Sequence, residues 1–145
     1  MTRINLVDTK ELCDQHLLAE WRELTRIPNS IVSNKLNTSF IPSRYTVRTA
    51  SNPSGGVGHV KFFINKLKFL HKRYNSLLVE LHLRGFSCEN FWPQVTFPSE
   101  LWGDYLPTVE AINLNRERIK ERFPKKARYY RQLRSYNEDN FNDSL

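Results

Sequence analysis

Residues 59–85, HVKFFINKLKFLHKRYNSLLVELHLRG, contain the clearest structural pattern in the chain. Apolar residues recur there at steps of three and four, the spacing that places them on one face of an α-helix. They are Phe63, Leu67, Leu70, Tyr74, Leu77, Leu78 and Leu81. Gly85 follows as a residue that can end a helix in the left-handed conformation. The pattern predicts a helix over residues 59–84 with one buried face.

Two further segments have helical periodicity. Over residues 9–26 the apolar side chains fall on one side of a helix, and Asp8 with Glu11 has the spacing of a capping box. These apolar residues are Cys13, Leu17, Leu18, Trp21 and Leu24. The other helix is expected to begin near residues 107–108 and to end before Pro124. Its inward-facing residues are predicted to be Val109, Ile112, Ile119 and Phe123.

The segments between these helices are irregular. Residues 51–59, SNPSGGVGH, are rich in Gly and Pro, whereas residues 91–103, FWPQVTFPSELWG, are aromatic enough to pack. The Gly-Gly-x-Gly at 55–58 lacks the strand and the GK[ST] of a phosphate-binding loop. We therefore predict an all-α fold, a single compact domain of three main helices with irregular connecting loops, over residues 1–136. Residues 137–145 are predicted to be a polar, acidic, flexible tail.

The composition argues against several classes of protein. The 145 residues are 39% hydrophobic and 12% aromatic, which is typical of one folded domain. The sequence has no run of 18 apolar residues and no apolar segment of a secretory signal, so we expect no membrane span and a cytoplasmic location. Cys13 and Cys88 lie far apart without a CxxC or Cys/His cluster, which predicts reduced, buried thiols and neither a metal nor a cofactor.

Positive charge is concentrated toward the C-terminal end of the sequence. The chain has 22 Lys and Arg against 15 Asp and Glu, a net charge of +7. Residues 116–134, RERIKERFPKKARYYRQLR, contain nine basic and two acidic residues. Such a block, with Tyr129 and Tyr130 inside it, is typical of a surface that binds the phosphate backbone of nucleic acid. A solvated helix face is the alternative.

The polar side of the helix expected over residues 9–26 carries a narrow stripe. The stripe consists of Gln15, Ala19, Arg22 and Arg26, with Glu23 next to it and His16 nearby. Arg22 and Arg26 are as consistent with surface salt bridges to Glu residues as with nucleic-acid contact. The other histidines are expected to be polar or capping residues rather than catalytic ones: His59, His71 and His82.

The N-terminus offers a different kind of reactive group. Thr2 follows the initiator Met1, and its small side chain permits removal of that methionine. The pKa of an α-amino group is near 7.7–8.0, against about 10.4 for Lys, and the neighbouring Arg3, Arg22 and Arg26 are expected to lower it further. A neutral amine can form a Schiff base with a sugar carbon. Met-Thr is a common beginning, so this feature alone does not indicate catalysis.

Three blocks of sequence carry a family pattern. They are MTRINL (1–6) with ELCDQHLLAEWRELTR (11–26), the stretch from GHV (58–60) to RGF (84–86), and GDY (103–105) with Pro107, reaching Arg118. In these blocks the chain resembles the pyrimidine-dimer DNA glycosylases with abasic-site (AP) lyase activity, the family of the endonuclease V of T-even phages. The resemblance covers most of the chain but is poor over residues 25–57.

The resemblance implies a mechanism. Thr2 supplies the nucleophilic amine, which attacks C1′ of the damaged nucleotide, and Glu23 is the catalytic carboxylate, which stabilises the positive charge on the sugar. β-Elimination from the resulting imine then cleaves the strand. The implied function is DNA repair: excision of UV-induced cyclobutane pyrimidine dimers by N-glycosylase action, followed by AP lyase cleavage, without a metal or a cofactor.

The resemblance also implies contacts with double-stranded DNA that contains pyrimidine dimers. The residues expected to bind DNA are Arg3, Gln15, His16, Arg22, Arg26, Arg118 and Arg122. Family members bend the duplex and flip a base opposite the dimer into a protein pocket. We expect a monomer, located in the host cytoplasm if a phage encodes the protein.

Two alternatives stay open at this point. The same chemistry could act on another damaged base or on abasic sites only, because the poorly matching residues 25–57 bear on lesion preference. The chain could also be a non-catalytic basic DNA-binding protein, although retention of both Thr2 and Glu23 argues against a pure binder. Tyr129 and Tyr130 are as consistent with packing under the third helix as with DNA contact.

Overall fold

The structure is a computed structural model that describes residues 4–130. Its helices are the short 3-10 helix η1 (Thr9–Glu11), α1 (Asp14–Leu24), α2 (Arg26–Val32), α3 (His59–Phe62), α4 (Leu67–Leu83) and α5 (Val109–Glu121). No strand forms within residues 4–130, so the predicted all-α fold is confirmed. Thr2, Arg3 and the predicted tail at 137–145 lie outside the described residues.

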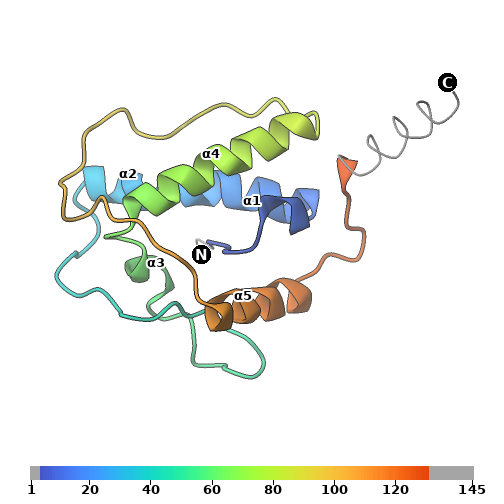
Figure 1. The fold of residues 1–145 in the computed structure, drawn as a ribbon, viewed down its shortest axis with the longest axis horizontal. Coiled ribbons are helices and arrows are strands. Elements are labelled where there is room, and N and C mark those ends of the chain that lie inside the picture. The colour runs from blue at the N-terminus through green and yellow to red at the C-terminus, as the bar shows by residue number, and fades with distance from the viewer. Residues whose placement is uncertain (1–3, 131–145) are drawn as a thin grey trace, which may run out of the picture.

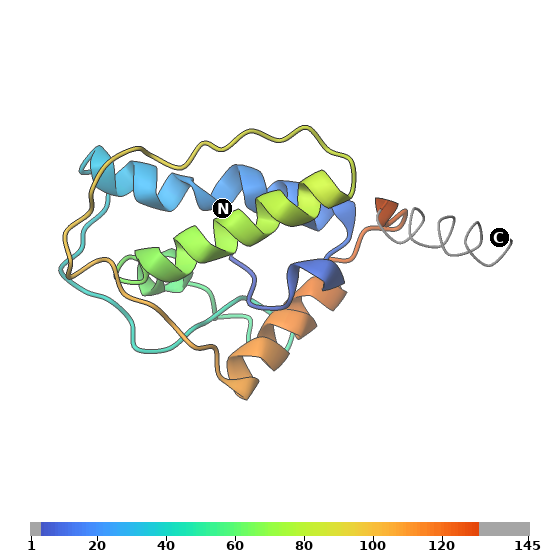
Figure 2. The same cartoon turned by 45° about the horizontal axis from the view of Figure 1, so that its top comes forward.

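The three longest helices surround an extended N-terminal segment. Figures 1 and 2 show α1 and α4 side by side, with α2 continuing beyond the end of α1. α5 lies apart from this pair, and residues 4–8 run between α5 and the other two helices. Residues 33–58 and 84–108 form the long connections around the outside. The first described residues are therefore enclosed by the fold rather than left on its surface.

The helix predicted over residues 59–84 is interrupted at residues 63–66, which separate α3 from α4. The reason lies in a distant segment. The N–H of Leu67 donates to the carbonyl of Leu101 at 3.0 Å, and the N–H of Lys68 donates to that of Gly103 at 3.1 Å. These carbonyls satisfy N–H groups that the first turn of a helix leaves without partners. The seven apolar residues predicted for the buried face are all buried, and Gly85 ends the helix with a φ of 95°.

The helix predicted over residues 9–26 is also divided, and its capping box is wrong. Asp8 accepts a hydrogen bond from the N–H of Lys10 at 2.9 Å, but Glu11 forms an ion pair with Arg116 instead of returning to Asp8. The chain therefore makes η1 first and begins α1 only after Cys13. At the other end α1 gives way to α2 at Thr25, and Pro28 lies in the first turn of α2, where a missing N–H costs little.

The predicted limits of the last helix are confirmed, whereas half of its predicted buried face is wrong. Thr108 caps α5 by accepting a hydrogen bond from the N–H of Ala111 at 3.1 Å. Val109 is 71% exposed and Phe123 is 46% exposed, although Ile112 and Ile119 are partly buried against the core. The buried positions of α5 are Ala111, Asn115 and Arg118. α5 thus buries polar side chains that bind other segments.

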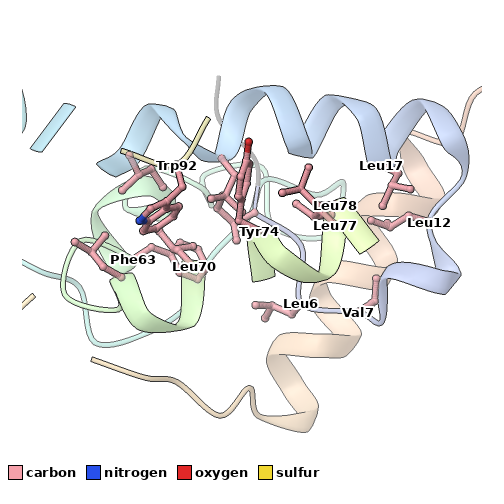
Figure 3. Packing of buried hydrophobic residues seen from close by; sticks show 14 of the residues in the cluster. Leu6, Val7, Leu12, Leu17, Phe63, Leu70, Tyr74, Leu77, Leu78 and Trp92 are labelled. Carbon is pink, nitrogen blue, oxygen red and sulfur yellow. The ribbon is translucent and has the colours of Figure 1, made fainter. Parts of the chain in front are cut away.

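The hydrophobic core lies between α1 and α4 and extends under the 84–108 connection. Figure 3 shows Tyr74, Leu77 and Leu78 of α4 between that helix and α1, and the ring of Trp92 in the connection lies 6.1 Å from that of Tyr74. Both cysteines are buried free thiols, as predicted. Across residues 4–130, no helix has the length and apolar character needed to cross a bilayer.

Buried ion pairs join α4 to α1. Arg73 donates to both carboxylate oxygens of Glu20, at 2.8 and 3.0 Å. Arg84 pairs with Asp14 and with Glu80, each at 2.9 Å, and all of these side chains are nearly inaccessible to solvent. Because a bidentate arginine–carboxylate pair has a fixed geometry, these contacts set how the two helices lie against each other.

Candidate active site

The site is built on the extended residues 4–8, whose backbone is held by hydrogen bonds from its first residue, Ile4, onward. The N–H of Ile4 donates to Nε2 of His59 at 2.9 Å, and the Tyr45 hydroxyl donates to the Ile4 carbonyl at 3.2 Å. Nε2 of His59 must therefore accept, so Nδ1 carries the proton and donates to the Thr46 carbonyl at 2.8 Å. Burial raises the pKa of the Tyr45 hydroxyl, which stays a neutral donor.

Asn115 of α5 holds the middle of the same segment. Its Oδ1 accepts hydrogen bonds from the N–H groups of Leu6 and Val7, at 2.7 and 3.2 Å. Its Nδ2 donates to Oδ1 of Asn5 at 2.9 Å, and Asn5 in turn donates to Glu20 at 2.8 Å. The Val7 carbonyl accepts from Arg73. A continuous buried network therefore fixes the path of the chain as it approaches the N-terminus.

Sequence reasoning missed Asn115, Tyr45 and the structural role of His59. A signal was present for Asn115, because it lies at helical spacing between Ile112 and Ile119 on the face predicted to be apolar. A polar residue at such a position must find partners when it is buried. Nothing in the sequence identified those partners as the backbone of residues 6 and 7.

A small cleft of about 60 Å³ opens beside this segment. Several of the predicted site residues line it together: its walls include Asn5, His16, Glu20, Glu23, Arg118 and Arg122. Glu23 is half-buried near the C-terminal end of α1, and α5 supplies the two arginines opposite. We call this the Glu23 cleft. It brings together Glu23, Arg118 and Arg122, which the sequence analysis assigned to one site from different segments.

A larger cavity of about 150 Å³ adjoins the cleft. The two share Asn5, Arg118 and Arg122, and the larger one continues toward Tyr45, Arg48 and Asn115. We call it the Tyr45 cavity. Arg118 is 8% exposed and donates to the Arg48 carbonyl, so this arginine also joins α5 to the 33–58 connection. Arg122 is exposed.

Arg22 and Arg26 of the predicted stripe are exposed on the surface. Within residues 4–130 neither of them forms an ion pair. The alternative that they serve as surface salt bridges to Glu residues therefore finds no support in the described part of the chain.

Gln15 and His16 lie under the segment that follows α5. Nε2 of Gln15 donates to the Lys126 carbonyl at 2.7 Å, and its Oε1 accepts from the N–H of Arg128 at 3.2 Å. His16 contacts the Arg122 carbonyl through Nε2 at 3.1 Å and packs edge-on against Phe123. Both side chains therefore hold residues 122–128, which follow α5, against α1.

The tyrosines of the basic block make packing contacts. The Tyr130 ring lies 5.5 Å from that of Phe86, and the Arg84 guanidinium lies 5.8 Å from the Tyr129 ring centre. The N–H of Tyr130 donates to Asp14 at 3.3 Å. These contacts favour packing over DNA contact for both tyrosines, but the packing is against residues at the ends of α4 and α1 and not under the third helix as predicted.

A helical domain with a carboxylate in an arginine-walled cleft has the features of an enzyme that acts on a nucleic-acid backbone. The family model of the pyrimidine dimer DNA glycosylases matches residues 1–94, and the chain belongs to this family of DNA repair enzymes. The matched stretch contains Glu23, Tyr45 and His59, whereas α5 with Asn115 and both cleft arginines follows it. DNA is accordingly the substrate.

Proposed function

We propose that the protein excises cyclobutane pyrimidine dimers through a Schiff base on the amine of Thr2, and then cleaves the strand by β-elimination. One observation carries the proposal: Asn5, only three residues after Thr2, lines the same cleft as Glu23. Three residues span at most roughly 10–11 Å. The proposed nucleophile is therefore within reach of the Glu23 cleft along the chain.

The first step is the glycosylase reaction. After removal of Met1, the neutral Thr2 nitrogen forms a bond to C1′ while the bond from C1′ to the pyrimidine breaks. The electron pair leaves with the base, which takes up a proton. The Glu23 carboxylate stabilises the positive charge that develops on the sugar, because a nearby anion lowers the energy of an oxocarbenium-like state.

The second step is strand cleavage. The nitrogen transfers one proton to O4′ as the bond between C1′ and O4′ breaks and the sugar ring opens, which leaves a protonated imine between Thr2 and C1′. Loss of a proton from C2′ then expels the phosphate at C3′, and water finally releases the sugar from the amine. We assign the assistance of these proton transfers to Glu23, whose side chain lines the cleft.

DNA binding is assigned to the arginines around the cleft. Arg22 and Arg26 are exposed on helices next to Glu23, and Arg122 is exposed at its rim. With Arg3 and Arg118 they are proposed to contact the phosphates near the lesion. Gln15 and His16 are proposed to bind there together with the 122–128 segment that they hold.

The Tyr45 cavity offers room for a base turned out of the duplex. Roughly 150 Å³ is enough to admit a single aromatic ring such as benzene in an engineered cavity. The cavity has this volume and adjoins the Glu23 cleft through shared walls. Base flipping next to the reacting sugar is therefore compatible with the space that the fold provides.

The proposal is tested with Glu23→Gln on three duplexes: one with a defined cis-syn thymine dimer, one with an abasic site and one undamaged. We expect the variant to bind the dimer duplex with unchanged affinity and to cleave it about 100-fold more slowly or worse. Glu110→Gln, which changes an exposed carboxylate in the first turn of α5, is the matched control and should cleave normally.

The duplexes also separate the alternatives. Cleavage of the dimer duplex by the unaltered protein supports the proposal, whereas cleavage of the abasic duplex alone would restrict the enzyme to lyase action. Binding without cleavage of any duplex would identify a DNA-binding protein. Normal turnover by Glu23→Gln would remove Glu23 from its proposed role.

A further inference from the structure

The loop of residues 48–56 is docked on the same face of α5 that borders the site. The N–H of Ala50 donates to Glu121 at 2.7 Å, and the Ser51 hydroxyl donates to Glu117 at 2.6 Å. Arg118, which lies between these two glutamates in the sequence, donates to the Arg48 carbonyl. Three polar residues of α5, Glu117, Arg118 and Glu121, thus fix the loop.

Two glycines allow the loop to fold back on itself. A Cβ at Gly55 would lie 2.5 Å from the Val47 carbonyl oxygen, and one at Gly56 would lie 3.1 Å from the Arg48 nitrogen. Gly56 also has a φ of 90°, which L-residues with side chains rarely adopt. The glycine-rich sequence therefore allows the loop to approach the backbone of Val47 and Arg48 closely.

This docking brings Arg48 to the wall of the Tyr45 cavity, together with Arg118 and Arg122. Arg48 and Arg122 also line a second, more open hollow, to which Glu121 contributes as well. The Arg48 side chain is exposed, and its Nε donates to the Pro53 carbonyl at 3.0 Å, which orients the guanidinium. Within residues 4–130 neither Arg48 nor Arg122 forms an ion pair.

The charges around the cavity favour an anion between these arginines. Of the described residues that line the Tyr45 cavity, three are arginines and none is acidic, whereas Glu121 lines the adjoining hollow instead. Three arginines thus line one cavity, and a guanidinium presents paired donors that match the oxygens of a phosphate.

We propose that Arg48 is a further DNA-binding residue, which together with Arg122 binds a backbone phosphate at the entrance of the Tyr45 cavity. The inference rests on the proposed function in so far as damaged duplex DNA is the ligand. It assigns a role to a residue from the poorly matching part of the chain, and it makes the 48–56 loop a wall of the DNA-binding surface.

The test measures affinity as a function of salt. The probe is a duplex with a tetrahydrofuran abasic analogue, which has no aldehyde and so is bound without being cleaved. Arg48→Ala should weaken binding by about tenfold, as expected for one charge-assisted hydrogen bond. The slope of log K against log salt should become shallower by about 0.9, the value for one phosphate contact. Arg48→Lys should retain the slope because it retains the charge.

Arg44→Ala is the matched control, since Arg44 is exposed in the same connection and is not part of either cavity wall. It should leave the slope nearly unchanged. An unaltered slope in Arg48→Ala, or an equal change in Arg44→Ala, would overturn the assignment of this contact to Arg48. Either result leaves the proposed function intact if the unaltered protein still cleaves the dimer duplex, so the two failures are distinguishable.

Discussion

Asn115 is the residue on which the geometry of the site depends most directly. It is 1% exposed, and one amide side chain satisfies two backbone N–H groups and the side chain of Asn5. Because Asn5 also lines the Glu23 cleft, a displacement of this contact would be transmitted to residues nearer the N-terminus. Asn115 is thus a positioning residue in our account, and it does not touch the reacting atoms.

Replacing Asn115 by Ala should uncouple DNA binding from catalysis. The change leaves the N–H groups of Leu6 and Val7 without acceptors, at a cost of roughly 1–3 kcal/mol for each buried group. Single-turnover cleavage at saturating dimer duplex should fall by about tenfold or more, because small displacements of a nucleophile cost rate steeply. The dissociation constant should change little.

Asn113→Ala controls for the loss of an amide from the exposed face of the same helix. It should leave both rate and affinity unchanged. A folded Asn115→Ala protein that cleaves at the normal rate would show that the buried network is not needed to place the nucleophile.

At the scale of single residues, the sequence predicted which residues share the site better than it predicted the hydrogen bonds that position them. Glu23, Arg118 and Arg122 were predicted for one site, and the structure brings them to one cleft. The predicted burial of Val109 and Phe123 was wrong, because apolar character alone was used where α5 instead buries Asn115 and Arg118. Arg48 escaped prediction because its place depends on hydrogen bonds from a loop to a helix some 70 residues away.

The helices α1 and α4 are joined by charges as well as by apolar packing. Arg84 contacts two carboxylates and the carbonyls of Thr9 and Lys10, so it also fixes η1 at the start of the fold. A buried ion pair adds little net stability when it is complete, but the loss of one partner leaves an uncompensated buried charge.

Replacing Arg84 by Met should therefore lower the free energy of unfolding by about 3–5 kcal/mol, because Asp14 and Glu80 are left buried without their cation. Urea denaturation followed by circular dichroism measures the loss. Lys72→Met breaks the exposed pair with Asp104 and should cause a much smaller change. Comparable losses in the two variants would contradict a special role for the buried pairs.

Element positions followed from periodicity, and element boundaries did not. The buried face of α4 and its end at Gly85 were predicted from residues within the helix itself. The breaks at residues 63–66 and at Thr25 were not, since the first depends on carbonyls contributed by Leu101 and Gly103. Hydrogen bonds between distant segments leave no periodic trace in the sequence.

The whole molecule combines an anchored N-terminal segment with a basic surface. Its net charge is +7, and α5 with the following segment carries much of the excess. The family match ends at residue 94. Asn115 of α5, which binds the backbone of the N-terminal segment, and the cleft arginines Arg118 and Arg122 all lie beyond it. The proposed active site is therefore built from segments inside and outside the family match. The central claim of the proposal concerns the nitrogen of Thr2.

Borohydride trapping on a duplex with one thymine dimer tests that claim most directly. The reductant converts an imine into a stable amine, so peptide mass spectrometry can locate the linked residue. We predict a single protein–DNA adduct on the α-nitrogen of Thr2, in protein that has lost Met1. An adduct on a lysine side chain, or full activity in protein that retains Met1, would contradict the account.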